Sequence, residues 1–146
     1  LLKSEILLIQ TPNSFKPTRS NIINLKSFLN KIIKELNNEK IVFEFRGDFL
    51  KKEKSILEIC KNFKVEHCVD LFRNKPLFCN EILYFRIHGF GKKIMYNYNF
   101  SDKELNELKN RIKEVSKEFN PKEIFVLFNN YNMYQNALDF IKILEH

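Results

Sequence analysis

Seven residues in which apolar and polar side chains alternate decide the fold of this sequence: Ile82-Leu83-Tyr84-Phe85-Arg86-Ile87-His88. The alternation predicts a β-strand, because side chains two positions apart lie on the same face of a strand. Leu83, Phe85 and Ile87 would share one face, and the polar side chains would share the other. Helices on both faces would bury these polar groups at a high energetic cost. The stretch therefore indicates a sheet with one apolar face and one polar face.

A second stretch, Ile41–Arg46, repeats this pattern. Its Ile and Phe side chains fall on one face of the predicted strand, and Val42, Glu44 and Arg46 fall on the other. Two separate strands thus carry charged residues on a face that an open sheet would cover with helices.

Strands and helices alternate along the rest of the chain. Apolar runs predict further strands at Ile6–Gln10, Val65–Leu71 and Ile124–Phe128. Apolar residues at helical spacing predict helices at Ser20–Leu36, Lys52–Phe63, Ser101–Phe119 and Met133–Leu144. This alternation is typical of a parallel sheet covered by helices.

Two architectures fit this order of elements. Length favours an open, doubly wound sheet, because a (β/α)8 barrel usually has at least about 200 residues. The polar strand faces favour a barrel, in which the apolar face meets the outer helices and the polar face points inward. We therefore expect an α/β fold of the TIM type, here a partial barrel of about five parallel strands with outer helices. We treat residues 1–146 as a single domain.

The composition excludes two classes of protein. A hydrophobic fraction of 44% in 146 residues excludes a disordered chain, and no apolar run approaches the length of a membrane span. The cysteines are odd in number and show no CxxC spacing, so we expect neither disulfides nor a zinc site. A reducing compartment, and hence a cytoplasmic location, follows from this prediction. The net charge of +7 would suit an anionic partner.

Polar side chains gather at the carboxyl ends of the predicted strands, where barrel enzymes place their catalytic groups. We assign catalytic roles to four of them: Glu44, Asp70, Arg86 and His88. A carboxylate would activate water or accept a proton, His88 would shuttle it, and an arginine would stabilise developing negative charge. The alternative is a buried ion-pair network that only closes the barrel interior.

A second group of polar and aromatic residues would bind an anionic or sugar-like substrate: Gln10, Arg46, Tyr96, Tyr98, Asn129 and Asn130. A glycosidase-like pair of Glu44 and Asp70 is one alternative. A metal ion held by Glu44, Asp70 and His88 is another, but these residues lack a metal-binding spacing, so we assign no metal and no cofactor.

Other residues with reactive side chains have plainer interpretations. We expect His67 to be a solvated or capping histidine, and Cys60 and Cys68 to be inert packing residues. The basic, glycine-bearing stretch 89–93 matches neither the Walker nor the dinucleotide-binding fingerprint.

A non-catalytic, nucleic-acid-binding module is the alternative function. Two loops interleave cations that would meet phosphates with rings that would stack on bases. The residues are Arg73, Lys75, Lys92 and Lys93, with Phe72, Phe78, Phe90, Tyr96 and Tyr98.

Several of these motifs resemble the YecE-like family, called domain of unknown function 72. The resemblance rests on Gln10-Thr11-Pro12, Glu44-Phe45-Arg46, Asp70, Arg86-Ile87-His88-Gly89, Tyr96, Tyr98, Phe128-Asn129-Asn130 and Asn136-Ala137. It implies a TIM-type barrel of which this chain resembles the C-terminal part. The chain departs from the family pattern at Gly47 and Phe49, where the family has a histidine and a Ser-Trp pair. No reaction is established for the family, so we expect an enzyme of unknown reaction, a hydrolase or a lyase.

A partial barrel would expose two sheet edges, which favours pairing with another strand. We therefore expect the missing units in the same polypeptide or in a second copy, and Gln10 on an edge strand. His146 is treated as the remnant of a tag and excluded from the site.

Overall fold

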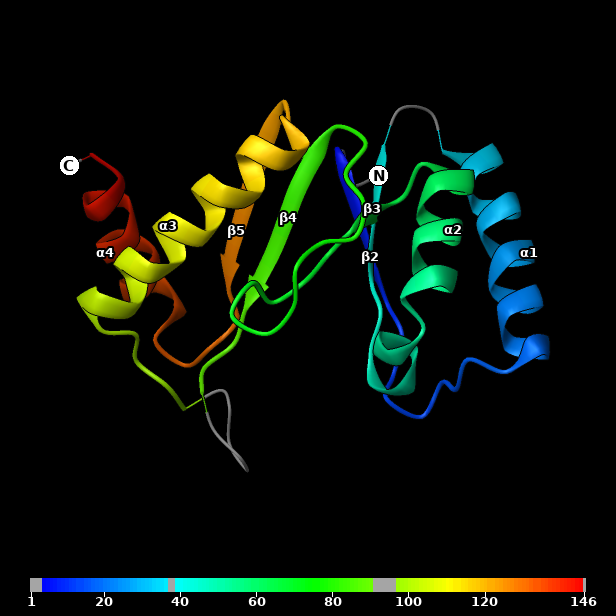
Figure 1. Ribbon diagram of the computed structural model, residues 1–146, viewed down its shortest axis with the longest axis horizontal. Coiled ribbons are helices and arrows are strands. Elements are labelled where there is room, and N and C mark those ends of the chain that lie inside the picture. The colour runs from blue at the N-terminus through cyan, green and yellow to red at the C-terminus, as the bar shows by residue number, and fades with distance from the viewer. Residues whose placement is uncertain (1–3, 37–38, 91–96, 146) are drawn as a thin grey trace. The chain divides into compact units, whose positions relative to one another are not determined.

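The computed structural model describes residues 4–36, 39–90 and 97–145 (Figure 1). These residues form an α/β fold with five parallel strands in two small sheets and four α-helices. The chain divides into two compact units, and each is described by itself. Unit 1 comprises Leu1–Cys68 and Leu77–Glu81, and unit 2 comprises Val69–Pro76 and Ile82–His146.

Unit 1 contains a three-stranded sheet in the order β1-β2-β3. Its elements are β1 (Ile6–Gln10), α1 (Arg19–Glu35), β2 (Lys40–Glu44), the 3-10 helix η1 (Gly47–Lys51), α2 (Glu53–Phe63) and β3 (Glu66–His67). β1 pairs with β2 in parallel from Ile6 opposite Lys40 to Gln10 opposite Glu44. Among the described residues β1 is an edge strand, which confirms the prediction for Gln10.

The core of unit 1 lies between this sheet and its helices, which Figure 1 shows on one side of it. Ile41, Phe43 and Phe45 are buried together with residues of α1 and α2 such as Leu29 and Ile56. The alternation predicted for Ile41–Arg46 is thereby confirmed, because its apolar residues all pack into this core. Glu44 and Arg46 are left on the opposite face.

Gly47 is required where η1 begins. Its φ of +61° lies in the left-handed region, and an added Cβ would come within 2.6 Å of the Asn13 carbonyl oxygen. A histidine, as expected from the family pattern, would therefore be strained here.

Unit 2 contains β4 (Ile82–Ile87), α3 (Asp102–Phe119), β5 (Glu123–Phe128) and α4 (Met133–Glu145). β4 and β5 pair in parallel over their whole length, from Ile82 opposite Glu123 to Ile87 opposite Phe128. On its other side, β4 receives a single bridge from Val69 to Phe85. Helix α3 begins with the predicted capping box of Ser101 and Glu104 and buries four apolar residues, among them Leu105 and Leu108.

The predicted strand Val65–Leu71 is wrong in extent. Only Glu66–His67 forms a regular strand, and Val69 makes an isolated bridge. The extended chain ends at Asp70, whose carbonyl accepts hydrogen bonds from the backbone N–H groups of Arg73 and Asn74. This turn replaces further strand pairing. The helix η1 was not predicted, and the other predicted elements agree with the structure to within one or two residues.

No helix formed by the described residues has the length and apolar character needed to cross a membrane.

Candidate functional site

Three side chains of unit 2 contact one another at the carboxyl ends of its strands. His88 directly follows β4 and Asn129 directly follows β5, and the pairing of Ile87 with Phe128 sets the two residues opposite each other. Asn129 Nδ2 lies 2.9 Å from His88 Nε2, and His88 Nδ1 lies 3.3 Å from Asp70 Oδ2. We call these three residues the Asp-His-Asn cluster. They are the part of the predicted site that the structure of unit 2 brings together.

Asp70 is the hub of this cluster. Its Oδ1 accepts a hydrogen bond from the Phe72 N–H, and its Oδ2 accepts one from the His88 N–H at 3.0 Å. Arg73 Nε lies 3.4 Å from the same Oδ2. The carboxylate is buried, with 7% of its side chain exposed. A buried carboxylate with this many donors orients its neighbours, which is a different task from activating water.

The contacts of His88 determine which ring nitrogen is basic. Because an ionised carboxylate only accepts hydrogen bonds, the nitrogen that faces Asp70, Nδ1, carries the proton. In the neutral ring Nε2 is then an acceptor, and the Asn129 amide donates to it. The predicted catalytic role of His88 stays a prediction.

Arg73 contacts the Asp-His-Asn cluster, although from the sequence we expected it among the cations of a nucleic-acid-binding loop. Its Nη2 donates a hydrogen bond to the Gly89 carbonyl at 3.0 Å, in addition to the contact of Nε with Asp70. The sequence signal for the contact with Asp70 was the position of Arg73 three residues later, within one turn of chain. Arg86, the predicted catalytic arginine, lies on β4 and is half-buried.

Asn130, predicted to bind substrate, belongs to a different network. Its Nδ2 donates to the Tyr98 carbonyl at 2.6 Å and to Asn136 Oδ1 at 2.7 Å, and Asn136 donates to Asn99 Oδ1. Among the described residues Asn130 Oδ1 is buried without a partner. This network fixes the segment that precedes α3, and a ligand contact for Asn130 stays a prediction.

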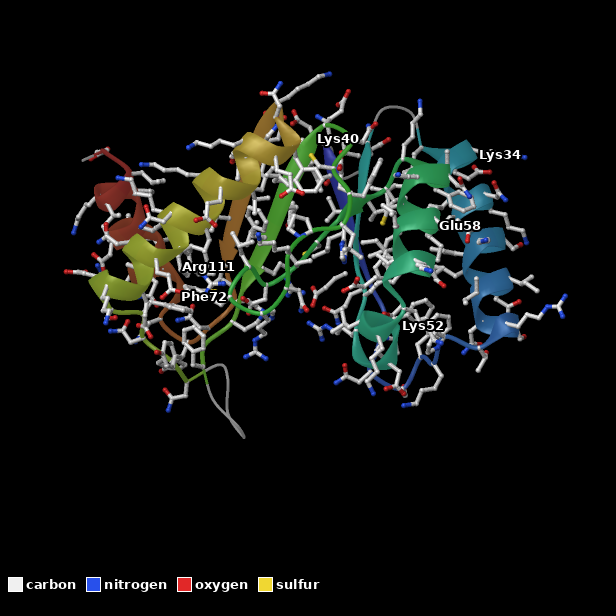
Figure 2. The ribbon with its side chains drawn as sticks, in the orientation of Figure 1. Lys34, Lys40, Lys52, Glu58, Phe72 and Arg111 are labelled. Carbon is white, nitrogen blue, oxygen red and sulfur yellow. The ribbon has the colours of Figure 1, made fainter. Side chains whose placement is uncertain are left out.

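The aromatic residues near the cluster contact one another. Phe72 stacks on Phe100 with ring centroids 5.7 Å apart, and Phe90 meets both Phe72 and Tyr98 edge to face. Arg111 covers the ring of Phe72 at 5.4 Å, and Figure 2 shows the two side chains together. These rings therefore pack on one another and on Arg111, and stacking on bases stays a prediction.

Tyr98 is tied to the beginning of α3. Its hydroxyl donates a hydrogen bond to Glu104, and this bond, together with burial, raises the pKa of Tyr98 to about 12. Tyr96, Lys92 and Lys93 lie outside the described residues. Phe78 is partly buried and packs against the core of unit 1, and a stacking role for its ring stays a prediction.

Unit 1 has its own polar group at the strand ends. Arg46 Nε donates to Glu44 Oε1 at 2.6 Å, and Glu44 is buried. The backbone N–H of Arg46 also donates to Thr11 Oγ1. Gln10 is exposed at the end of β1 and is the register partner of Glu44. Gln10 and Glu44 are therefore neighbours in one sheet, and Arg46 contacts Glu44 just beyond the end of β2.

Two buried polar residues of β3 bind the backbone of a returning segment. Glu66 accepts hydrogen bonds from the N–H groups of Asn80 and Glu81 at 2.7 and 2.8 Å. His67 Nδ1 accepts one from the Leu77 N–H at 3.0 Å. We call these contacts the β3 clamp. The sequence analysis missed Glu66, because a glutamate in a short strand carries no signal of burial.

His67 is a capping histidine, but its expected solvation is wrong. It is buried, and burial lowers its pKa to about 4, so the ring is neutral. Cys60 is buried in the core of unit 1, and burial, with the nearby charge of Glu66, raises its pKa to about 12. That pKa makes the thiolate scarce, in agreement with the predicted packing role.

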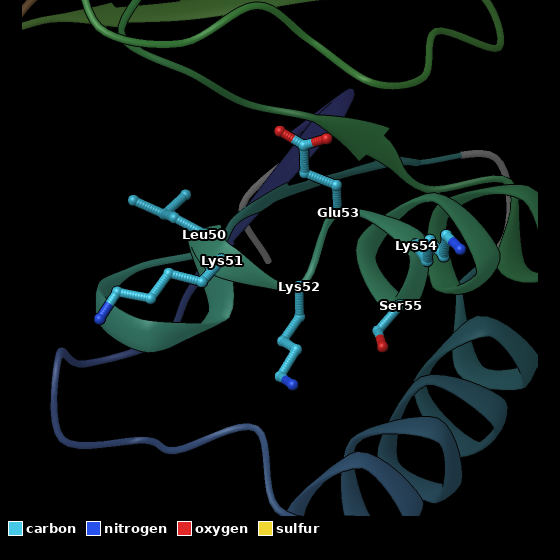
Figure 3. Close-up of a pocket in the computed structure, with 6 residues that line it drawn as sticks. All are labelled: Leu50, Lys51, Lys52, Glu53, Lys54 and Ser55. Carbon is cyan, nitrogen blue, oxygen red and sulfur yellow. The ribbon is translucent and has the colours of Figure 1, made fainter.

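The described residues include no group of three His, Cys, Asp or Glu side chains placed to hold a metal ion. A hollow of about 350 Å³ lies where η1 meets α2 and is lined by residues 50–55. Figure 3 shows that the side chains of Lys51, Lys52 and Lys54 point in different directions there. They do not converge on a common ligand, so this hollow is not part of the candidate site.

Comparison with known proteins gives structural matches but no match among curated proteins. A crystal structure of a DUF72 family protein from Thermotoga maritima is similar with a TM-score of 0.74 and 28% identity, covering 97% of this chain and 58% of that chain. One of a DUF72 family protein from Enterococcus faecalis has a TM-score of 0.73 and 23% identity, covering 97% of this chain and 61% of that chain. This chain thus spans about three-fifths of the length of these proteins.

The family itself is shown by a sequence model that covers almost the whole chain. The model described as "Protein of unknown function DUF72" matches residues 2–146. It is the family that the strand-end motifs resemble. The chain therefore belongs to the DUF72 family.

Proposed function

We propose that unit 2 carries an acid/base site in which His88 Nε2 exchanges a proton with a bound ligand. The observation that supports it is the ring of His88 held at both nitrogens, by Asp70 on one side and Asn129 on the other. A histidine held in this way has one defined tautomer and one basic atom. The reaction is a hydrolysis if Nε2 deprotonates water, or an elimination if it deprotonates the substrate.

The ligand of this site is a small anionic or polyhydroxylated molecule. A hydroxyl group of the ligand replaces the Asn129 amide at Nε2, and Asn129 then hydrogen-bonds another ligand oxygen. Arg73 and Arg86 supply positive charge near the Asp-His-Asn cluster and on β4. That Gln10, Glu44, Arg46 and Tyr96 serve the same ligand stays a prediction.

The proposal includes a TIM-type barrel as the complete fold. Parallel strands followed by helices support it, as does the division of β2 into a face packed on helices and a face carrying Glu44. The similarity to longer DUF72 structures supports it as well. In such a barrel, residues that follow strands line the catalytic mouth.

The experiment uses His67 and His88, the two buried imidazoles among the described residues. Histidine ring signals are followed by NMR while inorganic phosphate or a neutral monosaccharide is added. We expect one of the two probes to shift the His88 signals and to leave those of His67 unchanged, because His67 lies in the β3 clamp. Asp70→Asn should weaken this response at least tenfold. If neither probe moves the His88 signals, or if both imidazoles respond alike, the proposal is wrong.

A parallel assay tests turnover with chromogenic nitrophenyl esters, glycosides and phosphates. We expect one class to be hydrolysed by the natural chain and not by His88→Gln. Hydrolysis that His88→Gln leaves unchanged would assign the activity to other residues.

A further inference from the structure

Arg111 reaches from the middle of α3 to the turn that follows Asp70. Its Nη1 donates a hydrogen bond to the Leu71 carbonyl at 3.1 Å, and its guanidinium carbon lies 5.4 Å from the centre of the Phe72 ring (Figure 2). Its Nε and Nη2 donate to Glu107, one turn earlier on the same helix. A pair of the second kind is common on helix surfaces, whereas the contacts with Leu71 and Phe72 lead off the helix. Arg111 therefore ties this turn to α3.

The Leu71 carbonyl and the Phe72 N–H belong to one peptide group. That group is planar and trans, so its oxygen and its N–H point in opposite directions. Arg111 binds the oxygen, and the Phe72 N–H donates to Asp70 Oδ1 at 3.1 Å. The other oxygen of the same carboxylate, Oδ2, lies 3.3 Å from His88 Nδ1. One peptide group thus connects Arg111 to the carboxylate that contacts His88.

The turn needs such support because it is a single turn of helix. The Asp70 carbonyl accepts hydrogen bonds from the N–H groups of Arg73 and Asn74, and no helix continues beyond them. One isolated turn is unstable by itself, since it orders several residues for one or two hydrogen bonds. Helix α3 is a firm base, because it has 18 residues and buries four apolar side chains, among them that of Ile112. The contacts of Arg111 therefore fasten a weak turn to a stable helix.

The charge of Arg111 adds to this effect. Hydrogen bonds in a chain polarise one another, so a guanidinium on the Leu71 oxygen makes the Phe72 N–H a better donor to Asp70. Arg73 brings a second positive charge to the same carboxylate, with its Nε 3.4 Å from Oδ2. Both carboxylate oxygens are therefore supported, and an ionised carboxylate keeps the proton of the imidazole on the nitrogen that faces it.

We propose that Arg111 is a positioning residue of the Asp-His-Asn cluster. It holds the Leu71–Phe72 peptide group so that Asp70 keeps His88 in the Nδ1–H tautomer. The inference rests on the proposed function, because this tautomer leaves Nε2 as the basic atom that a ligand would meet. Arg111 acts on the site through Asp70 and is given no catalytic role.

The experiment measures the tautomer of His88 in the free chain. Long-range ¹H–¹⁵N NMR spectra give the populations of the Nδ1–H and Nε2–H forms of the neutral ring. Arg111→Ala should lower the ratio of Nδ1–H to Nε2–H about fivefold, which is the effect of losing one ordinary hydrogen bond. Arg111→Lys keeps a cation that can donate to the Leu71 carbonyl, so its ratio should lie between those of the natural chain and Arg111→Ala.

Lys109→Ala is the matched control. Lys109 also lies on α3 and also donates to a backbone carbonyl, that of Ile143 in α4, at 2.5 Å. This bond ties α3 to α4 instead of to the turn after Asp70. The tautomer ratio of Lys109→Ala should therefore equal that of the natural chain.

Hydrogen exchange of the α3 amide groups checks that each variant is folded. If Arg111→Ala is not, Arg111→Met replaces it, because methionine keeps an apolar stem on Phe72 but donates no hydrogen bond. An unchanged ratio, an equal fall in Lys109→Ala, or a fall matched by faster exchange along all of α3 would overturn the proposal. None of these measurements uses a ligand or turnover. A His88 that responds to no probe would defeat the proposed function, and the ratio would still decide the role of Arg111.

Discussion

The β3 clamp of unit 1 and the Asp-His-Asn cluster of unit 2 hold their buried histidines in different ways. In unit 1, Glu66 and His67 of the β3 clamp bind backbone N–H groups of the segment 77–81. In unit 2, Asp70, His88 and Asn129 bind one another as side chains, and they come from three separate places in the chain. A side chain that satisfies backbone groups is committed to the fold, because moving it leaves those groups unpaired. A side chain bonded to another side chain can exchange that partner for a ligand.

This difference distinguishes the polar residues of the β3 clamp from those of the proposed site without reference to the chemistry of a reaction. His67 and His88 are both buried imidazoles, yet only His88 has its second nitrogen on a side-chain amide that can be displaced. His67 has its Nε2 buried without a partner among the described residues. Replacing one residue of the β3 clamp and one residue of the Asp-His-Asn cluster tests this comparison.

The largest effect is expected for Asp70→Ala. The change removes the acceptor of the Phe72 and His88 N–H groups and leaves the His88 ring and Arg73 without their carboxylate. Removing a buried charged group of this kind lowers the free energy of unfolding by about 3–4 kcal/mol. Urea denaturation measures it. Asp139→Ala is the control, since Asp139 pairs with the exposed Lys142 and should cost less than about 1 kcal/mol. Equal costs would contradict the assignment of Asp70 as a hub.

The sequence was sufficient to predict which residues follow the strands, but not what they contact. Alternation in Ile82–His88 identified the polar face because successive side chains point to opposite faces of a strand. The contact of His88 with Asn129 depends on the register of β4 with β5, which no local pattern specifies. Arg73 was overlooked for a related reason, since its contact with Asp70 requires the turn that ends the predicted strand Val65–Leu71 early.

The second-largest effect is a pH dependence of folding stability, which arises from His67 in the β3 clamp. The pKa of His67 is lowered from 6.5 to about 4 by burial, so the unfolded chain binds a proton between these values and the folded chain does not. Stability should therefore be independent of this group above pH 6.5 and fall as the pH decreases toward 4. At about 1.4 kcal/mol for each pH unit, the total loss is on the order of 3 kcal/mol.

Denaturation at pH 7 and pH 5 measures this dependence. His67→Gln keeps an oxygen acceptor for the Leu77 N–H but cannot titrate, so its stability should change less between the two pH values. Glu66 is present in both proteins, and its contribution cancels. The same loss in both proteins would show that His67 is not the responsible group.

A smaller effect is expected for the Glu44–Arg46 pair, which lies within one strand end of unit 1. Glu44→Gln removes the charge from a contact of 2.6 Å. Arg46 keeps about a quarter of its side chain exposed, so water can replace part of the lost interaction. We expect a loss of about 1 kcal/mol, clearly below that of Asp70→Ala. A loss as large as that for Asp70→Ala would indicate that Glu44 is also a hub.

The smallest effects concern the caps of the two longest helices, one in each unit. Thr18 accepts one hydrogen bond, from the Asn21 N–H at the beginning of α1. Ser101 accepts one from the Glu104 N–H, and it also donates its hydroxyl to the Glu104 carboxylate at 2.7 Å. Thr18→Ala should cost about 0.5–1 kcal/mol, and Ser101→Ala about 1–1.5 kcal/mol, because the second change removes both hydrogen bonds of the Ser101 hydroxyl, although the Ser101 backbone N–H still donates to Glu104. Thermal denaturation of the two variants gives this order.

Glu104 provides an independent readout of the Ser101 cap. Burial raises the pKa of Glu104, but hydrogen bonds from Tyr98 and from the backbone and side chain of Ser101 lower it more, and the result lies below the usual value of 4.5. Ser101→Ala removes the hydroxyl donor, so the pKa of Glu104 should rise. The stabilisation by this carboxylate, which is present above its ordinary pKa and lost as the pH falls through the lowered one, should then disappear at a higher pH than in the natural chain. NMR titration of the Glu104 carboxyl carbon measures the shift. An unchanged titration would mean that Tyr98 and the Ser101 backbone N–H hold the carboxylate without the Ser101 hydroxyl.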